Sequence, residues 1–243
     1  AFEAPLNETK PTDSRGIYTQ GQPSNNFQFK ATVNYNPVSY WFFRATFIKY
    51  LNEELRAPWN PDFTYVIGYE DWHPYTFSLL YSNYSGNRLA PDKDKGEYFT
   101  KLEEGTISLG WKFPGLELLE ELISIDESSG LAHKIDYNTV PKYYDLKSND
   151  REQWKHYVTL NTKYTIFSYF FATLRLYYYP ENGQQQPWDP DFTYGFGYFD
   201  WHAGTVSVQY NNYSGNRYPG RNGYSGTGRF MDGSITVFWS WAL

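Results

Sequence analysis

Two pairs of residues in this sequence have the types and spacing of an acid–base couple. Asp71 stands two residues before His73, and Asp200 stands two residues before His202. A carboxylate beside an imidazole can orient the ring and assist proton transfer, as in general acid–base catalysis. No candidate nucleophile recurs beside either pair. We therefore favour a structural turn capped by the aspartate, and we expect the protein not to be an enzyme.

A second repeated motif, Asn-Tyr-Ser-Gly-Asn-Arg, occupies residues 83–88 and 212–217. Its amides and its guanidinium are donors that suit a sugar or a carboxylate. Its glycine permits a positive φ, which also fits a loop base pinned to a wall by hydrogen bonds. We favour the loop base, and the ligand-binding interpretation stays open for the same candidates: Asn87, Arg88, Asn216 and Arg217.

Composition limits the remaining chemistry. The chain has no cysteine, which excludes disulfides and thiolate metal sites. Residues 92–96 resemble part of a calcium loop but lack its remaining ligands, so we expect no metal and no cofactor. The net charge of −6 argues against a general nucleic-acid binder.

The motifs above belong to a longer internal repeat. Residues 58–88 return as 187–217 at a constant offset of 129, with 21 identities in 31 positions and no gap. Such self-similarity predicts a duplicated structural unit. We place all of 1–243 in one domain, with repeat 1 at about 27–114, a connection at about 115–150 and repeat 2 at about 152–243.

Much of the chain alternates with period two, the pattern of a strand with two different faces. Ile235, Val237 and Trp239, for example, alternate with Thr236 and Phe238. The pattern predicts an all-β fold with five strands in each repeat. The predicted strands are 27–36, 41–51, 62–71, 76–85 and 105–113, then 156–165, 169–179, 191–200, 205–214 and 233–243.

The connections between these strands alternate strictly in length. Tight turns at 36–39, 72–75, 165–168 and 201–204 alternate with long polar segments at 52–61, 86–104, 180–190 and 215–232. In a meander, all tight turns then lie at one end of the sheet and all long loops at the other.

With this asymmetry, the chain resembles Gram-negative outer-membrane β-barrel proteins over nearly all of residues 27–243. Its last strand ends Trp239-Ser240-Trp241-Ala242-Leu243, whereas such proteins usually end on an aromatic residue. The resemblance implies a single antiparallel transmembrane barrel in the bacterial outer membrane, with aromatic rings against lipid and a polar interior. The alternative is a soluble β-sandwich with the aromatic face as its core.

Strand parity adds two elements. Five strands per copy is odd, so two copies in one orientation require a strand between them and another before residue 27. We predict these strands at Ala132–Val140 and Gly16–Gln20, giving about 12 strands in total. Residues 115–125 have helical periodicity and predict a short amphipathic helix at the tight-turn end.

The charges on the polar face suggest a function. They are mostly basic, with Glu70 as the main acid, and the predicted lumen cations are Lys30, Arg44, Lys112, Lys163 and Arg175. A basic lumen favours a porin-like channel for anionic small solutes or acidic oligosaccharides. The same cations could instead satisfy a packed, closed interior. That alternative is a docking barrel of an envelope assembly, such as polysaccharide export, with a protein partner at the helix. An outer-membrane hydrolase ranks below both.

Overall fold

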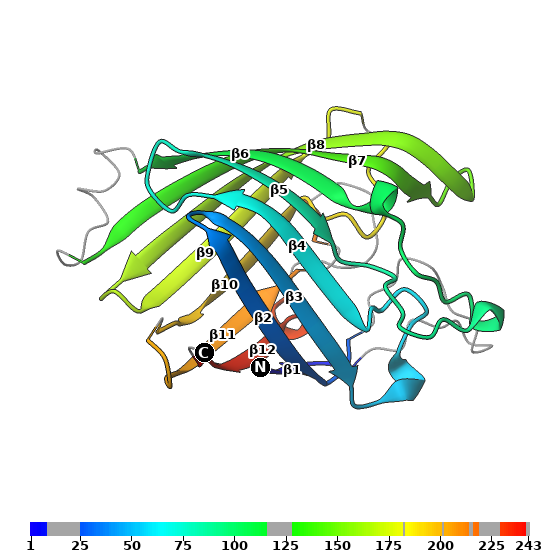
Figure 1. The fold of residues 1–243 in the computed structure, drawn as a ribbon, viewed down its shortest axis with the longest axis horizontal. Helices are drawn as coiled ribbons and strands as arrows, with labels where there is room; N and C mark the ends of the chain where they lie inside the picture. Colours follow the sequence, from blue (N-terminus) through cyan, green and yellow to red (C-terminus); the bar gives the residue numbers. More distant parts are fainter. Residues whose placement is uncertain are drawn as a thin grey trace.

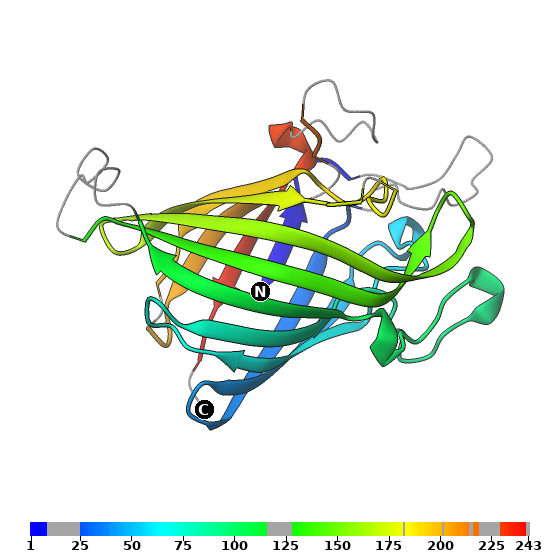
Figure 2. The ribbon, with the colours of Figure 1, turned by 90° about the horizontal axis from the view of Figure 1, so that it is seen from above.

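A closed barrel of 12 antiparallel strands forms the protein (Figures 1 and 2). The computed structural model describes residues 1–8, 25–115, 128–181, 183–200, 202–213, 216–218 and 229–241. Neighbouring strands follow one another in the chain, and β12 pairs with β1 to close the barrel. The strands are β1 Phe2–Pro5, β2 Gln28–Val38, β3 Trp41–Tyr50, β4 Phe63–Glu70, β5 Phe77–Asn83, β6 Thr106–Pro114, β7 Gly130–Asp145, β8 Asp150–Ile166, β9 Phe170–Tyr178, β10 Phe192–Tyr198, β11 Val206–Asn212 and β12 Ser234–Trp239.

The strand number predicted from parity is confirmed. Nine of the ten strands of the two repeats form within four residues of their predicted bounds, β8 begins six residues early at Asp150 (156 − 150 = 6), and the intervening strand is β7. β1 is the barrel strand that precedes residue 27, and the predicted segment Gly16–Gln20 lies outside the described residues. The predicted helix 115–125 also lies almost entirely outside them. The described helices are single 3-10 turns: η1 Glu53–Leu55, η2 Lys93–Lys95, η3 Leu102–Glu104 and η4 Phe230–Asp232.

The two ends of the barrel differ, as the connection lengths predict. The tight turns β2–β3, β4–β5, β8–β9 and β10–β11 lie on the left in Figure 1, opposite the long connections. The junction between the repeats breaks the strict alternation. There β6 and β7 are joined by residues 115–129 at the tight-turn end, and β7 and β8 by residues 146–149 at the long-loop end. β7 and β8 are 16 and 17 residues long, and their hairpin projects past the other strands (Figure 1).

The barrel has an apolar outside and a polar inside. Because side chains alternate along a strand, every strand presents one face to each side. Large apolar side chains on the outer face are exposed, for example Phe47 at 49 % and Leu79 at 49 %. Polar side chains on the inner face are buried, for example Ser78, Asn138 and Thr236. This is the reverse of the distribution in water-soluble domains.

Candidate functional site

The strand register places all five predicted lumen cations on the inner face of the barrel wall. Lys112, Lys163 and Arg175 line a cavity of about 720 Å³. Arg44 lies on β3, where its Nε donates to Asn34 Oδ1 at 2.7 Å. The remaining predicted cation, Lys30, is paired with an acid, Glu3 of β1.

An ion-pair network follows the cavity wall from the tight-turn end. Lys112 Nζ donates to the carbonyl of Asp71 at 2.7 Å and lies 3.3 Å from Glu70 Oε1. The same Glu70 oxygen lies 3.2 Å from Lys134 Nζ. One carboxylate therefore lies between two ammonium groups from two different strands, β6 and β7.

The network continues toward the middle of the barrel. Lys134 Nζ lies 3.0 Å from Asp136 Oδ1, and Asn161 donates to Asp136 Oδ2 at 2.8 Å. Arg175 Nε in turn donates to Asn161 Oδ1. The side-chain amide of Asn161 thus lies between Arg175 and the carboxylate of Asp136. Lys163 forms no ion pair with any described residue, and its Nζ lies 5.4 Å from the centroid of the Phe171 ring.

This wall also carries three charged residues that were not predicted from the sequence: Glu3, Lys134 and Asp136. Alternation within the predicted strand Ala132–Val140 was enough to find Lys134 and Asp136, which are two residues apart and share a face. With them, the inner face of the described wall, apart from the projecting ends of β7 and β8, carries six cations and three acids. These are Lys30, Arg44, Lys112, Lys134, Lys163 and Arg175, with Glu3, Glu70 and Asp136.

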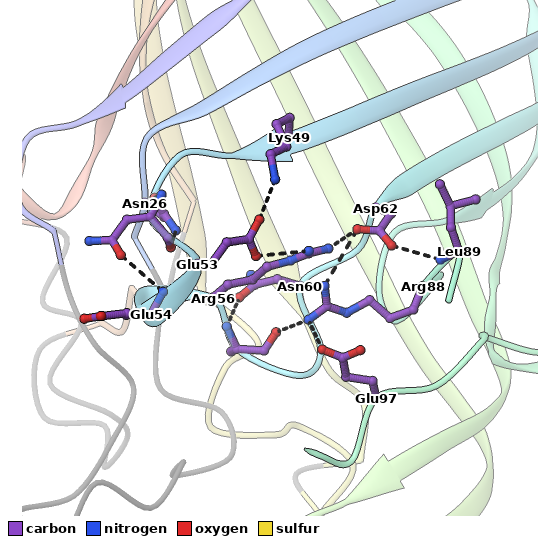
Figure 3. Close-up of polar contacts among 12 residues, drawn as sticks. Asn26, Lys49, Glu53, Glu54, Arg56, Asn60, Asp62, Arg88, Leu89 and Glu97 are labelled. Atoms are coloured by element: carbon purple, nitrogen blue, oxygen red, sulfur yellow. Dashed lines mark hydrogen bonds and ion pairs between the residues drawn. The ribbon is translucent and has the colours of Figure 1, made fainter. Parts of the chain in front are cut away.

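Arg88 lies in a buried loop base at the long-loop end (Figure 3), and the preceding Asn87 is also buried. Arg88 Nη2 donates to the carbonyl of Ala57 at 3.2 Å and lies 2.8 Å from Glu97 Oε1. Asp62 accepts from the backbone N–H of Leu89 at 2.9 Å. The Asn87 side chain donates to Asn83 Oδ1 inside the same cluster. These contacts tie the β3–β4 and β5–β6 connections together.

The surroundings of Asp62 in this cluster also shift its pKa. Burial raises the pKa of Asp62, but the Leu89 N–H and the guanidinium groups of Arg56 and Arg88 act in the opposite direction. The net effect holds the pKa of Asp62 below its usual value. The Asp62 carboxylate therefore stays charged between its cationic neighbours at neutral pH.

Asn216 and Arg217 occupy the corresponding loop base of the second repeat. Arg217 Nη2 donates to the carbonyl of Gln186 at 2.8 Å, and its Nη1 lies 3.2 Å from Asp191 Oδ1. Asn216 donates to the carbonyl of Phe192 at 3.0 Å. All four candidates from this motif thus contact protein groups, and their side chains are buried.

The Asp–His pairs form turn caps. Asp71 Oδ1 accepts from the His73 backbone N–H at 3.0 Å and lies 2.6 Å from His73 Nδ1. The Thr76 hydroxyl donates to the carbonyls of Asp71 and His73 at 3.2 and 2.6 Å. The β10–β11 turn repeats all of these contacts, with Asp200, His202 and Thr205. In both turns, the threonine hydroxyl beside the Asp–His pair thus donates to backbone carbonyls of the turn.

The described residues contain no group of three or more His, Asp or Glu side chains placed to hold a metal ion. No helix among them is long and apolar enough to cross a bilayer. No protein-family model, curated protein or solved structure matches the chain. The barrel and the charges on its inner face are therefore the basis for a functional proposal.

Proposed function

We propose that this barrel spans the outer membrane of a Gram-negative bacterium, with its outer face against lipid. Support comes from the outward positions, where rings such as Trp41, Phe47 and Trp239 are 49, 49 and 57 % exposed. In water, so many neighbouring apolar side chains would leave a large unpaired patch. In a bilayer, acyl chains cover such a band, and the polar residues face the interior.

Within that membrane, we propose that the protein is a porin-like channel for anionic small solutes or acidic oligosaccharides. One observation carries this proposal: the inner wall carries six cations and three acids, and four of these cations and two of the acids line a cavity of about 720 Å³. A narrow basic passage raises the local concentration of anions. Arg44, Lys163 and Arg175 contribute most, because none of them forms a direct ion pair with a described acid.

Ion selectivity in planar bilayers tests this proposal. The wild-type channel should conduct and favour anions in a salt gradient at low ionic strength, where screening is weak. Exchanging Arg44→Glu and Arg175→Glu together leaves four cations against five acids on the inner face. The reversal potential of this double variant should change sign toward cation preference.

The matched control is Lys95→Glu, because Lys95 is an exposed lysine on η2, outside the barrel wall. This exchange should leave the reversal potential close to that of the wild type. Flat current traces from correctly inserted wild-type protein would contradict the channel proposal. An unchanged reversal potential in the double variant would remove Arg44 and Arg175 from the conducting path.

We also propose that the two repeats arose by duplication of one unit. Support comes from positions 129 apart that make the same contacts, such as Asp71 with His73 and Asp200 with His202 at 2.6 Å each. The inner-face charges differ between the repeats, since position 46, which corresponds to Arg175, is a threonine. The shared contacts concern turns and loop bases, and the proposed transport function rests on residues that differ.

A further inference from the structure

Each copy of the Asn-Tyr-Ser-Gly-Asn-Arg motif holds an exposed aromatic ring beside buried amides. Tyr84 is 62 % exposed and Tyr213 is 61 % exposed, whereas the preceding Asn83 and Asn212 are 1 and 0 % exposed. The loop bases account for the buried asparagines and arginines of the motif. They require no exposed ring, so the two tyrosines are available to a ligand.

Both tyrosines lie at the long-loop end of the lumen. Gln209, Asn211 and Tyr213 alternate along β11 and beyond its end, and all three line the 720 Å³ cavity. Tyr213 lines this cavity and is still exposed, as expected for a side chain that faces a hollow interior. Tyr84 follows β5 in the same way, and its alternation with Ser78 and Ser82 places it on the inner face of the wall.

The groups around these rings are chemically matched to a sugar acid. Arg175 supplies a guanidinium that can hold a carboxylate through charge-assisted hydrogen bonds. Thr193, Gln209 and Asn211 line the same cavity and supply a hydroxyl and two amides for ring hydroxyls. A tyrosine presents an apolar face with a polar edge, which suits a ring that is apolar on its faces and polar around its rim.

We propose that Tyr84, Tyr213 and Arg175 form a binding subsite for one acidic sugar unit at the long-loop mouth of the lumen. The two rings hold the sugar faces, and the guanidinium holds the carboxylate. This inference rests on the proposed channel and specifies its substrate class, since a simple inorganic anion would gain little from two exposed aromatic rings.

Calorimetric titration of the full chain in detergent tests the subsite without requiring conductance. The probes are trigalacturonate, maltotriose as a neutral oligomer, and sodium sulfate. We expect trigalacturonate to bind most tightly. Tyr84→Ala and Tyr213→Ala should each weaken its binding about three- to tenfold, because each removes one ring contact. Phenylalanine at either position should keep the affinity within about twofold, since the ring face remains.

Two further variants separate the ring contacts from the charge. Arg175→Gln should weaken trigalacturonate binding while leaving maltotriose binding unchanged. Tyr178→Ala is the matched control, because Tyr178 is 66 % exposed on the outer face of β9. Heat-modifiable gel mobility of each variant shows whether its barrel is folded. If a variant does not fold, the wild-type protein is tested instead. Trigalacturonate should then protect Tyr84 and Tyr213 of the wild type from nitration.

The outcomes distinguish this proposal from the channel proposal. Absence of trigalacturonate binding, or unchanged affinity and no nitration protection at Tyr84 and Tyr213, would overturn the subsite even if the barrel conducts anions. Equal affinity for sulfate and trigalacturonate would also overturn it, because the rings would then contribute nothing. Flat bilayer currents with tyrosine-dependent binding intact would overturn the channel and leave the subsite in place.

Discussion

The two loop bases of the barrel use the same backbone contacts with different partner side chains. In both, an aspartate accepts from a backbone N–H at 2.9 Å, Asp62 from Leu89 and Asp191 from Tyr218. In both, an arginine donates to a carbonyl of the preceding loop, Arg88 at 3.2 Å and Arg217 at 2.8 Å. The contacts that fix the course of the backbone are thus present in both repeats.

The differences concern groups that supplement this framework. Asp62 accepts from Arg56, whereas Asp191 accepts from Gln185 at the corresponding position. Asn26 and Asn60 of the first base correspond to Lys155 and Asp189 of the second, which form an ion pair. In the first base the two asparagines make separate backbone contacts, Asn26 with Asn52 and Asn60 with Ala57. The second base thus has an ion pair at two positions that are uncharged in the first.

The largest expected effect comes from removing the shared aspartate. Asp191 is 0 % exposed and its partner Arg217 only 9 %, so Asp191→Ala leaves a buried guanidinium without its carboxylate. We expect a loss of about 3–5 kcal/mol in the free energy of unfolding, measured by urea titration in detergent. Asp62→Ala should cost less, about 1–3 kcal/mol, because Asp62 is 22 % exposed and Arg88 retains Glu97.

Asp94→Ala is the control for this pair of variants, since Asp94 lies on the exposed turn η2. Its free energy of unfolding should stay within about 0.5 kcal/mol of the wild type. Equal losses for Asp191→Ala and Asp62→Ala would contradict the difference in burial between the two bases.

The next effect concerns the Lys155–Asp189 ion pair of the second base, whose two positions are uncharged in the first. Lys155 is 7 % exposed and Asp189 15 %, so Lys155→Asn or Asp189→Asn alone leaves a poorly solvated charge and should cost about 2–4 kcal/mol. The double variant reproduces Asn26 and Asn60 of the first repeat. It should recover most of that loss, and a double-mutant cycle measures the coupling. Additive losses would show that the two sites do not compensate each other.

Most of the architecture could be predicted from the sequence because it depends on local alternation and on counting. Period-two patterns determine the strand faces, and an odd number of strands per repeat requires an intervening strand, which is β7. The position of β1 could not be predicted, because Phe2–Pro5 is only 4 residues long and too short for a periodic pattern. Its place depends on long-range pairing with β12, with Phe2 opposite Val237.

The candidate site was only partly predictable for a related reason. Alternation assigns Lys112 and Arg175 to the inner face, but it cannot show which charges meet across neighbouring strands. The Glu70 contacts with Lys112 and Lys134 depend on the register of β4, β6 and β7 together. The chemistry of its side chain indicates Arg88 as a candidate binding residue. Its burial against Asp62 and Glu97 depends on the three-dimensional structure and could not be predicted.

The smallest expected effect is a difference in acid sensitivity at the first loop base. The pKa of Asp62 is depressed in the folded protein, so its charged form contributes stability above the carboxyl's ordinary pKa in the unfolded chain. That contribution is lost as the pH falls through the depressed pKa. Asp62→Asn should therefore reduce the difference between the free energies of unfolding at neutral pH and near pH 3. Because other carboxylates also titrate, the comparison is made with Asp94→Asn, whose acid sensitivity should match the wild type. An acid response of Asp62→Asn equal to that of Asp94→Asn would mean that the cations around Asp62 do not stabilise its charge. The first base would then depend on its backbone contacts alone.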